Sequence, residues 1–168
     1  MKYYNGLAPG YDELHGEEQR RKLSILKAHL QVERSELLLD VGCGTGISSE
    51  FFNCRIIGID NSMEMVLEAK SKGVKNAAYI LADGEHLPFK TGVFDCVICV
   101  TALHNFTSPT NALFDMGRVA SNTGAVTILK KAERSRELEL LVNDIMEVTE
   151  VMDEEKDRIL IFNIPNNP

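Results

Sequence analysis

The segment Leu37–Gly46, with the sequence LLLDVGCGTG, constrains the fold of this chain more than any other. Its first half is a run of apolar residues typical of a buried strand, and three glycines at alternate positions follow. Glycine lets the backbone turn tightly and approach a ligand closely, and a helix that starts there presents free N–H groups. The segment therefore predicts a strand, a tight turn and a helix, with a small polar ligand bound at the turn.

The spacing of the glycines narrows the choice of ligand. A dinucleotide-binding fingerprint counted from Gly42 requires glycine or alanine at position 47, where this chain has Ile47. A P-loop ends with a lysine, and this turn has none. The pattern that remains is an acid, Asp40, followed by glycines at positions 42, 44 and 46.

Patterns typical of strands and of helices alternate along the whole chain. We expect strands over residues 37–41, 55–59, 77–81, 94–100, 125–130 and 158–164. We expect helices over residues 17–31, 46–53, 62–72 and 108–119, and a long last helix over residues 138–152. This alternation predicts an α/β fold of three layers, in which a doubly wound, mostly parallel sheet of order 3-2-1-4-5-6 is covered by helices on both faces.

Polar residues follow the first four expected strands, at the edge of the sheet where such folds bind ligands. Asp40 lies near the end of the first strand, Asp60 and Asp83 follow the second and third, and Thr101 and His104 follow the fourth. A carboxylate at position 60 can accept hydrogen bonds from both hydroxyls of a ribose, and one at position 83 can accept from an exocyclic amine. Three acids after three consecutive strands indicate one binding site.

Four segments, in this order, resemble the motifs of class I S-adenosylmethionine (SAM) methyltransferases. They are LLLDVGCGTG, IIGIDNS, ILADGEHLPF and FDCVICVTALHNF. The resemblance is to the small enzymes of the ubiquinone/menaquinone-biosynthesis type, in the methyltransferase type 11/25 group, and it spans residues 11 to 130. It implies the Rossmann-like fold of that family and SAM as the cofactor. None of the four motifs is specific for a methyl acceptor.

The resemblance also implies which residues form the site. It places the methionine end of SAM on the glycine turn with Asp40 near its amine, the ribose on Asp60 and the adenine beside Asp83. Tyr11, in the amino-terminal segment YDELHGEEQ, is implied as part of a lid over the cofactor. The cofactor-binding residues are then expected to be Tyr11, Asp40, Gly42, Cys43, Gly44, Gly46, Asp60, Asn61, Asp83, Gly84 and Thr101.

His104 is the candidate catalytic residue, as a base for an acceptor that carries a proton. Two alternatives stay open, because the same imidazole could line the pocket or hold the amine of SAM. No metal site is expected, and the pair Cys96-x-x-Cys99 lacks a second pair. Because this pair lies in an apolar run, we interpret it as two buried thiols on opposite sides of a strand.

The carboxyl-terminal part departs from the family pattern. The family ends with two strands, the last one antiparallel, whereas only residues 158–164 are recognisable as a strand here. We therefore expect the carboxyl-terminal hairpin to be reduced. No insertion for substrate binding is present, which leaves the acceptor pocket to the lid, to the loop after the fourth strand and to a partner chain.

Composition limits the partners and the compartment. Hydrophobic residues make up 44% of the 168 residues and the net charge is −7, as in a folded acidic protein. An acidic chain without a basic stripe is not expected to bind nucleic acid by itself. The sequence has neither an apolar run long enough to cross a membrane nor a signal-peptide pattern, so we expect a cytoplasmic protein that does not associate with membranes.

The sequence thus predicts a single methyltransferase domain over residues 1–168. Its expected parts are a lid and helix at 1–35, a cofactor-binding core at 36–132, and a last helix and strand at 133–168. The predicted function is SAM-dependent methyl transfer to an unidentified acceptor, with a small molecule favoured and a homo-oligomer or partner chain allowed. Two alternatives stay open: a SAM-binding scaffold subunit, and an RNA or protein methyltransferase that needs a partner. A nicotinamide-dependent oxidoreductase is disfavoured by Ile47 and by the acid after the third strand.

Overall fold

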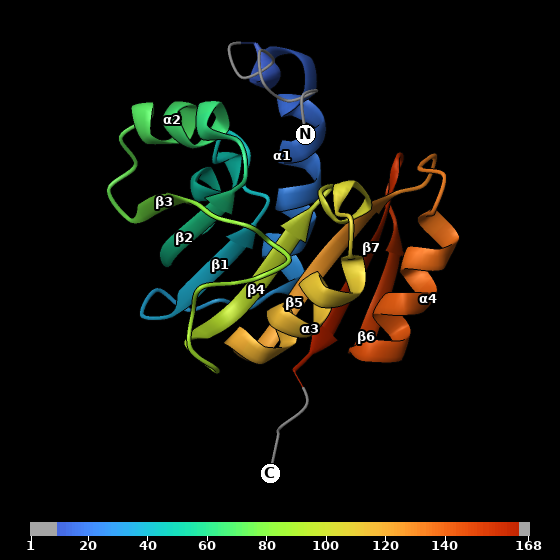
Figure 1. The fold of residues 1–168 in the computed structure, drawn as a ribbon. Coiled ribbons are helices and arrows are strands. Elements are labelled where there is room, and N and C mark those ends of the chain that lie inside the picture. Colours follow the sequence, from blue (N-terminus) through green and yellow to red (C-terminus); the bar gives the residue numbers. More distant parts are fainter. Residues whose placement is uncertain (1–9, 165–168) are drawn as a thin grey trace.

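Seven strands form one open sheet in the order β3-β2-β1-β4-β5-β7-β6 in the computed structural model, which describes residues 10–164 (Figure 1). The strands are β1 (Leu37–Val41), β2 (Arg55–Asp60), β3 (Ala77–Leu81), β4 (Phe94–Val100), β5 (Ala120–Leu129), β6 (Glu147–Asp153) and β7 (Asp157–Asn163). The first five pair in parallel, β7 is antiparallel to β5, and β6 is antiparallel to β7.

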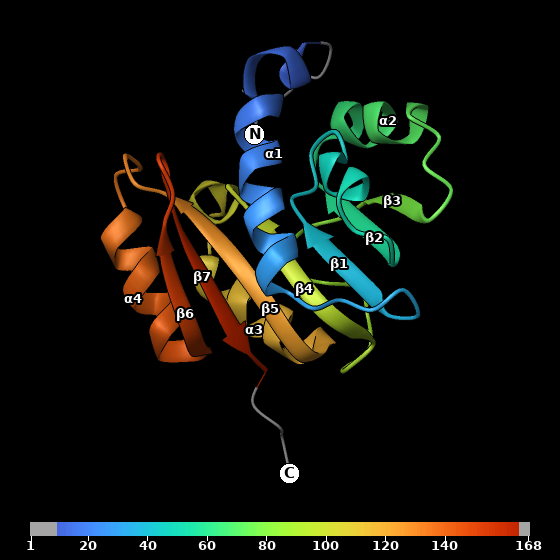
Figure 2. The same ribbon diagram turned by 180° about the vertical axis from the view of Figure 1, so that it is seen from behind.

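Helices cover both faces of this sheet, as the front and back views show (Figures 1 and 2). They are α1 (Tyr11–His29), α2 (Met63–Ser71), α3 (Pro109–Val119) and α4 (Ser135–Ile145), with 3-10 turns η1 (Ile47–Glu50) and η2 (Leu103–Asn105). The helices α1 and α2 pack on one face, and α3 and α4 pack on the other. No helix within residues 10–164 is long and apolar enough to cross a membrane.

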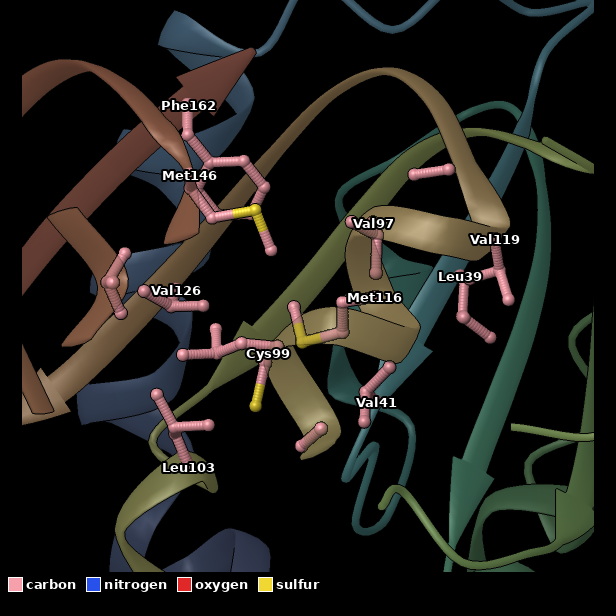
Figure 3. Close-up of a cluster of buried hydrophobic side chains, with 14 of the residues drawn as sticks. Leu39, Val41, Val97, Cys99, Leu103, Met116, Val119, Val126, Met146 and Phe162 are labelled. Atoms are coloured by element: carbon pink, nitrogen blue, oxygen red, sulfur yellow. The ribbon is translucent and has the colours of Figure 1, made fainter. Parts of the chain in front are cut away.

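The strand β1 explains why the sheet is apolar on both faces. Leu38 packs against α1, while its neighbours Leu39 and Val41 point to the other face and join the cluster under α3 and α4 (Figure 3). All three side chains are fully buried. Successive side chains of a strand alternate between faces, so a central strand covered on both sides must be apolar at nearly every position.

The doubly wound α/β fold, the parallel core of the sheet and the expected strand order are confirmed. The expected start signals are also confirmed at α2 and α3. The Ser62 side chain accepts a hydrogen bond from the backbone N–H of Met65, and Pro109 is the first residue of α3. These signals are local, and nothing in the tertiary structure opposes them.

The expectation of a reduced carboxyl-terminal hairpin is wrong. The last helix ends at Ile145, and residues 147–153 form β6, which pairs with β7 along its whole length. The strand β6 is an edge strand with mostly exposed side chains, so its sequence lacks the apolar run of a buried strand. Its two half-buried hydrophobic residues, Val148 and Met152, are spaced by four, which made the segment look like a continuation of the helix before it.

The connection from β3 to β4 contains no helix. Residues 82–93 cross from one strand to the other as a loop (Figure 1). One face of β3 is therefore less covered than the faces of the central strands, and Ile80 is 39% exposed there. The expected cover of helices on both faces holds for the centre of the sheet and fails at this edge.

Candidate functional site

A cavity of about 110 Å³ opens at the carboxyl edge of the sheet, where β1, β2, β3 and β4 end. It is lined by Gly42, Gly44, Ile59, Asp60, Asn61, Met65, Ala82, Gly84, Val100, Thr101, Ala102, Asn105 and Phe106. A smaller cavity of about 40 Å³ lies between the glycine turn and α1 and shares three of these residues, Gly42, Gly44 and Val100. Its further walls come from Gln19, Leu23, Asp40, Cys43, Thr45, Ile47 and Ser48.

The glycine turn needs its glycines for two different reasons. Gly42 and Gly44 have φ angles of 76° and 52°, a region that residues with a side chain rarely adopt. A Cβ atom on Gly42 would also lie only 2.5 Å from the Cβ of Ala102, in the loop after β4. A Cβ on Gly44 would meet no atom of residues 10–164 within 4 Å. The turn is thus closely packed at Gly42 and leaves open space for a ligand at Gly44.

Asp60, the last residue of β2, is fixed at the cavity by backbone hydrogen bonds. Its Oδ2 accepts from the N–H of Gly44 at 2.9 Å, and its Oδ1 accepts from the N–H of Ser62 at 2.9 Å. Burial nevertheless raises the pKa of this carboxyl group above its usual value. Each oxygen keeps a lone pair for a further donor, so Asp60 is preorganised to accept two hydroxyl groups of one ligand.

Asp40, in β1, is a buried acid with an incomplete set of partners. The Ser48 hydroxyl donates a hydrogen bond to its Oδ2, but no group within residues 10–164 donates to its Oδ1, which is fully buried. Burial raises the pKa of Asp40 to about 7, and the nearby charge of Asp60 contributes to this rise. A buried carboxylate without a cation is costly, and a cationic group bound in the smaller cavity would remove that cost.

Thr101, directly after β4, has an unusual backbone conformation held by hydrogen bonds from three elements. Its φ of 54° is the one positive value found at a residue other than glycine within residues 10–164. Its N–H donates to Thr127 Oγ1 at 2.8 Å, and its hydroxyl donates to Asp157 Oδ2 at 2.9 Å. The ammonium group of Lys22, in α1, donates to the same hydroxyl at 2.9 Å.

Sequence reasoning missed this group around Thr101, although one signal was available. Lys22 lies four residues before Leu26 and eight before Leu30, so it shares the buried face of α1 with two core leucines. A lysine at such a position needs an acid nearby. The acid that pairs with Lys22 is Asp157, at the start of β7, and Thr127 in β5 donates a hydrogen bond to the same acid. Only the tertiary fold brings these residues together.

The structure brings most of the predicted cofactor-binding residues to the two cavities. Gly42, Gly44, Asp60, Asn61, Gly84 and Thr101 line the larger cavity, and Asp40 and Cys43 line the smaller one. Gly46 and Asp83 lie beside them without lining either, and Asp83 is exposed and paired with His86 at 2.9 Å. The side chain of Tyr11 lies outside the described part of the chain.

His104 also lies outside the lining of both cavities, in the turn η2. Burial lowers the pKa of its imidazole, and its Nδ1 has no hydrogen-bond partner within residues 10–164. The neighbours that do line the larger cavity are Asn105 and Phe106. Neither of these two residues is among the site residues predicted from the sequence.

The four cysteines are free and buried, as the sequence suggested. Cys96 belongs to the cluster under α1 and Cys99 to the cluster under α3, so the two thiols lie on opposite faces of β4. Burial raises the pKa of both thiols. Within the described residues, no group of three histidine, cysteine or acidic side chains is placed to hold a metal ion.

Comparison with known proteins gives a consistent result. A family described as a methyltransferase domain matches residues 39–128, which is more than half of the chain. The ubiquinone/menaquinone biosynthesis C-methyltransferase UbiE of Blochmanniella pennsylvanica is 36% identical over 105 residues, which are 55% of this chain and 41% of that protein. The chain spans about half the length of the curated relatives it matches.

Solved structures resemble the chain over most of its length. One is a putative methyltransferase in complex with the Trm112 methyltransferase activator of Haloferax volcanii, with a TM-score of 0.85 and 16% identity over 99% of this chain and 98% of that one. Another is a SAM-dependent methyltransferase from Aquifex aeolicus, with a TM-score of 0.74 and 22% identity over 84% of this chain and 89% of that one. At such identities the likeness concerns the fold.

Proposed function

The chain belongs to the methyltransferase domain family, and on this premise we propose that it is a SAM-dependent enzyme that transfers a methyl group to an acceptor, with a small molecule favoured. The observation that carries the proposal is the buried carboxylate of Asp40, which has an oxygen without a donor beside the glycine turn. A site that lacks one positive group is matched by a ligand that supplies it.

The residues present fit the chemical groups of SAM. Its ammonium group would complete the partners of Asp40, and its ribose hydroxyls would donate to the fixed carboxylate of Asp60. The apolar walls of the larger cavity, from Ile59, Met65 and Phe106, suit the faces of an adenine ring. Asp83, which accepts a hydrogen bond from His86, is the proposed acceptor for the amino group of that ring.

SAM, when bound, supplies a methyl group that is already activated on a positively charged sulfur. The chain then has to bind and align two reactants, and alignment alone can lower the barrier by about 7–11 kcal/mol. The loop after β4 forms one wall of the larger cavity through Thr101, Ala102 and Asn105. We assign this wall to the positioning of the methyl end.

His104 is the proposed base for acceptors that lose a proton during the transfer. Burial lowers the pKa of its imidazole and so favours the neutral ring, which is the form able to accept a proton. Its Nδ1 is buried and has no hydrogen-bond partner among the described residues, so the methyl acceptor would reach this nitrogen only after a movement of the turn η2. The alternative is that His104 only shapes the wall of the site. Once an acceptor is known, the methyl-transfer activity of a His104 variant distinguishes the two roles.

Titration calorimetry with SAM, with its demethylated product S-adenosylhomocysteine (SAH) and with NAD tests the cofactor assignment. We expect micromolar binding of the first two and none of NAD. Asp60→Ala should weaken SAM binding about tenfold to a thousandfold, because two hydrogen bonds to a charged group are lost. Asp144→Ala, in an exposed part of α4, is the matched control and should leave the affinity unchanged. No SAM binding by the folded wild-type protein would overturn the proposal.

A second proposal is that the enzyme works with an activator chain. It is supported by the solved structure of a putative methyltransferase in complex with the Trm112 methyltransferase activator, because this chain resembles that one over 98% of its length. The chain also offers a sheet edge suited to a partner strand, since β3 carries no charged side chain and exposes Ile80 and Leu81 at 39% and 45%. Methyl transfer assayed with and without a co-expressed Trm112-type protein tests this. Equal activity in both cases would refute it.

A further inference from the structure

Lys22 is among the largest fully buried side chains of the described residues, and it is charged. It extends from α1 toward the carboxyl edge of the sheet, where its ammonium group lies 2.9 Å from Asp157 Oδ1 and 2.7 Å from Glu18 Oε1. A third contact of the ammonium group is the hydrogen bond to the Thr101 hydroxyl at 2.9 Å. Lys22 therefore connects α1 with β7 and with the loop after β4.

This position is costly to the fold, which suggests that it does more than hold the fold together. Burying Lys22 together with Asp157, and partly burying Glu18, removes hydration from all three charges. Apolar side chains of similar size often stabilise a protein equally well or better. Two of the contacts of Lys22 support Thr101. Lys22 donates a hydrogen bond to the Thr101 hydroxyl, and it is also paired with Asp157, which accepts a hydrogen bond from that same hydroxyl.

Thr101 is the residue whose conformation needs such support. A β-branched residue with φ of 54° is strained, and a strained conformation persists only when its surroundings fix it. Its N–H is bound to Thr127, and its hydroxyl is bound to Asp157 and Lys22. Lys22 is thus part of the set of contacts that keeps Thr101 in the left-handed region.

The conformation of Thr101 decides where the next residues lie. Ala102 follows it, and the Cβ of Ala102 packs so closely on Gly42 that a methyl group at position 42 would lie 2.5 Å away. Val100, Thr101 and Ala102 all line the larger cavity, and Gly42 lines both cavities. A change of φ at position 101 would therefore move the cavity wall against the glycine turn.

We propose that Lys22 is a positioning residue of the methyl-transfer site, which acts through Thr101 to fix the wall formed by the loop after β4. The proposal rests on the function proposed above, because it concerns the cavity assigned to SAM. Lys22 itself lines neither cavity among the described residues, and the expected effect on ligand binding is indirect, through its hydrogen bond to Thr101.

The test is a double-mutant cycle read out as the affinity for SAM and for SAH by titration calorimetry. Lys22→Met keeps the length of the side chain and removes its charge, and we expect it to weaken binding of both ligands about tenfold. Thr101→Gly allows the left-handed conformation without strain. In the Thr101→Gly background we therefore expect Lys22→Met to change the affinity less than about threefold.

Two further variants separate positioning from stability. Leu26→Ala removes a fully buried side chain one helical turn along α1 and lowers stability without touching Thr101, so SAM affinity should stay within about threefold. Thr101→Val keeps the shape and the strain but removes the hydroxyl that Lys22 binds, and it should reproduce the loss caused by Lys22→Met. If Lys22→Met fails to fold, this valine variant alone decides the proposal.

The outcomes distinguish this inference from the proposed function. If the wild-type protein does not bind SAM, the proposed function fails. If the wild-type protein binds SAM and both Lys22→Met and Thr101→Val keep its affinity within threefold, Lys22 is structural only and the inference is overturned. An equal loss from Lys22→Met in both the threonine and the glycine backgrounds also overturns it, because the effect would not pass through Thr101.

Discussion

Two buried acids at the same edge of the sheet have opposite surroundings. Asp157, at the start of β7, is fully buried and is paired with the ammonium group of Lys22, while the hydroxyls of Thr101 and Thr127 donate to its Oδ2. Asp40, in β1, is 3% exposed and receives one hydrogen bond, from Ser48, with no cation near it among the described residues.

The difference in hydrogen-bond and ion-pair partners indicates which buried acid stabilises the fold and which one binds a ligand. A buried charge whose partners all come from its own chain stabilises one arrangement of that chain. A buried charge with a missing partner lowers stability until something binds. On this reasoning Asp157 belongs to the support of the site, and Asp40 belongs to the part of the site that receives the ligand.

The largest expected effect is the loss of stability on breaking the paired acid. Asp157→Asn leaves Lys22 buried with only Glu18 as a counter-ion, and it should lower the free energy of unfolding by about 3–5 kcal/mol. Urea unfolding followed by circular dichroism measures this difference. A loss below about 1 kcal/mol would contradict the supporting role of Asp157.

Removing the other charge should affect binding instead of folding. Asp40→Asn should change the free energy of unfolding by less than about 1 kcal/mol at pH 8, since the native carboxylate is itself poorly compensated. The same variant should bind SAM about 10 to 100 times more weakly, because a charge-assisted contact is lost. A large loss of stability with unchanged SAM affinity would show that Asp40 stabilises the fold and does not bind the ligand.

The pH dependence of SAM binding should follow the titration of Asp40. Its carboxyl group has a pKa of about 7, so it is protonated in most molecules at pH 5.5 and ionised in most at pH 7.5. A cationic ligand binds the ionised form, so affinity should rise about tenfold or more over this range, and Asp40→Asn should abolish the rise. A flat profile in the wild-type protein would remove Asp40 from the ligand site.

The same titration has a consequence for the stability of the ligand-free protein. The folded pKa of Asp40 lies above the ordinary value of 3.8, so the folded state holds this proton longer than the unfolded chain does. Asp40 therefore favours folding below about pH 4, and this contribution decreases as the pH rises toward 7. Urea unfolding of the wild-type protein and of Asp40→Asn across this pH range measures the contribution. The free energy of unfolding of the wild-type protein should fall between pH 4 and pH 7 relative to that of the variant.

The smallest expected effect concerns His104. Its imidazole lines neither cavity among the described residues, so His104→Gln should change SAM affinity less than about twofold. Calorimetry with the purified variant measures this directly. A tenfold loss would place His104 in contact with the cofactor and would favour the alternative in which it holds the amine of SAM.

Much of the fold was predictable because its signals are local. The apolar run before Asp40, the cap at Ser62 and the proline at the start of α3 each act within a few residues, and each has the expected structure. The strand β6 was missed because an exposed edge strand needs no apolar run. The structure of this segment is determined by its pairing with β7, and the preference of its own residues for helix or strand does not determine it.

The site was predictable only where one segment of sequence forms it. The glycine turn follows β1 directly, and Asp60 is the last residue of β2. Ligands of such sheets bind where the parallel strands end, and this rule correctly predicted both at the cavity. The contacts of Thr101 come from α1, β5 and β7, and no local pattern joins these elements. The missing donor of Asp40 also becomes visible only when every neighbour is known.

The four buried thiols allow local opening of the protein to be measured at four positions without introducing new labelling sites. A thiol reagent in solution modifies a buried cysteine only when the surrounding part of the chain opens, so labelling rates measure local opening. Cys43 would report on the turn beside the smaller cavity, and Cys99 on the centre of the sheet. One mass-spectrometric time course would compare the two, and SAM should slow the labelling of Cys43 more than global stabilisation of the protein slows that of Cys99.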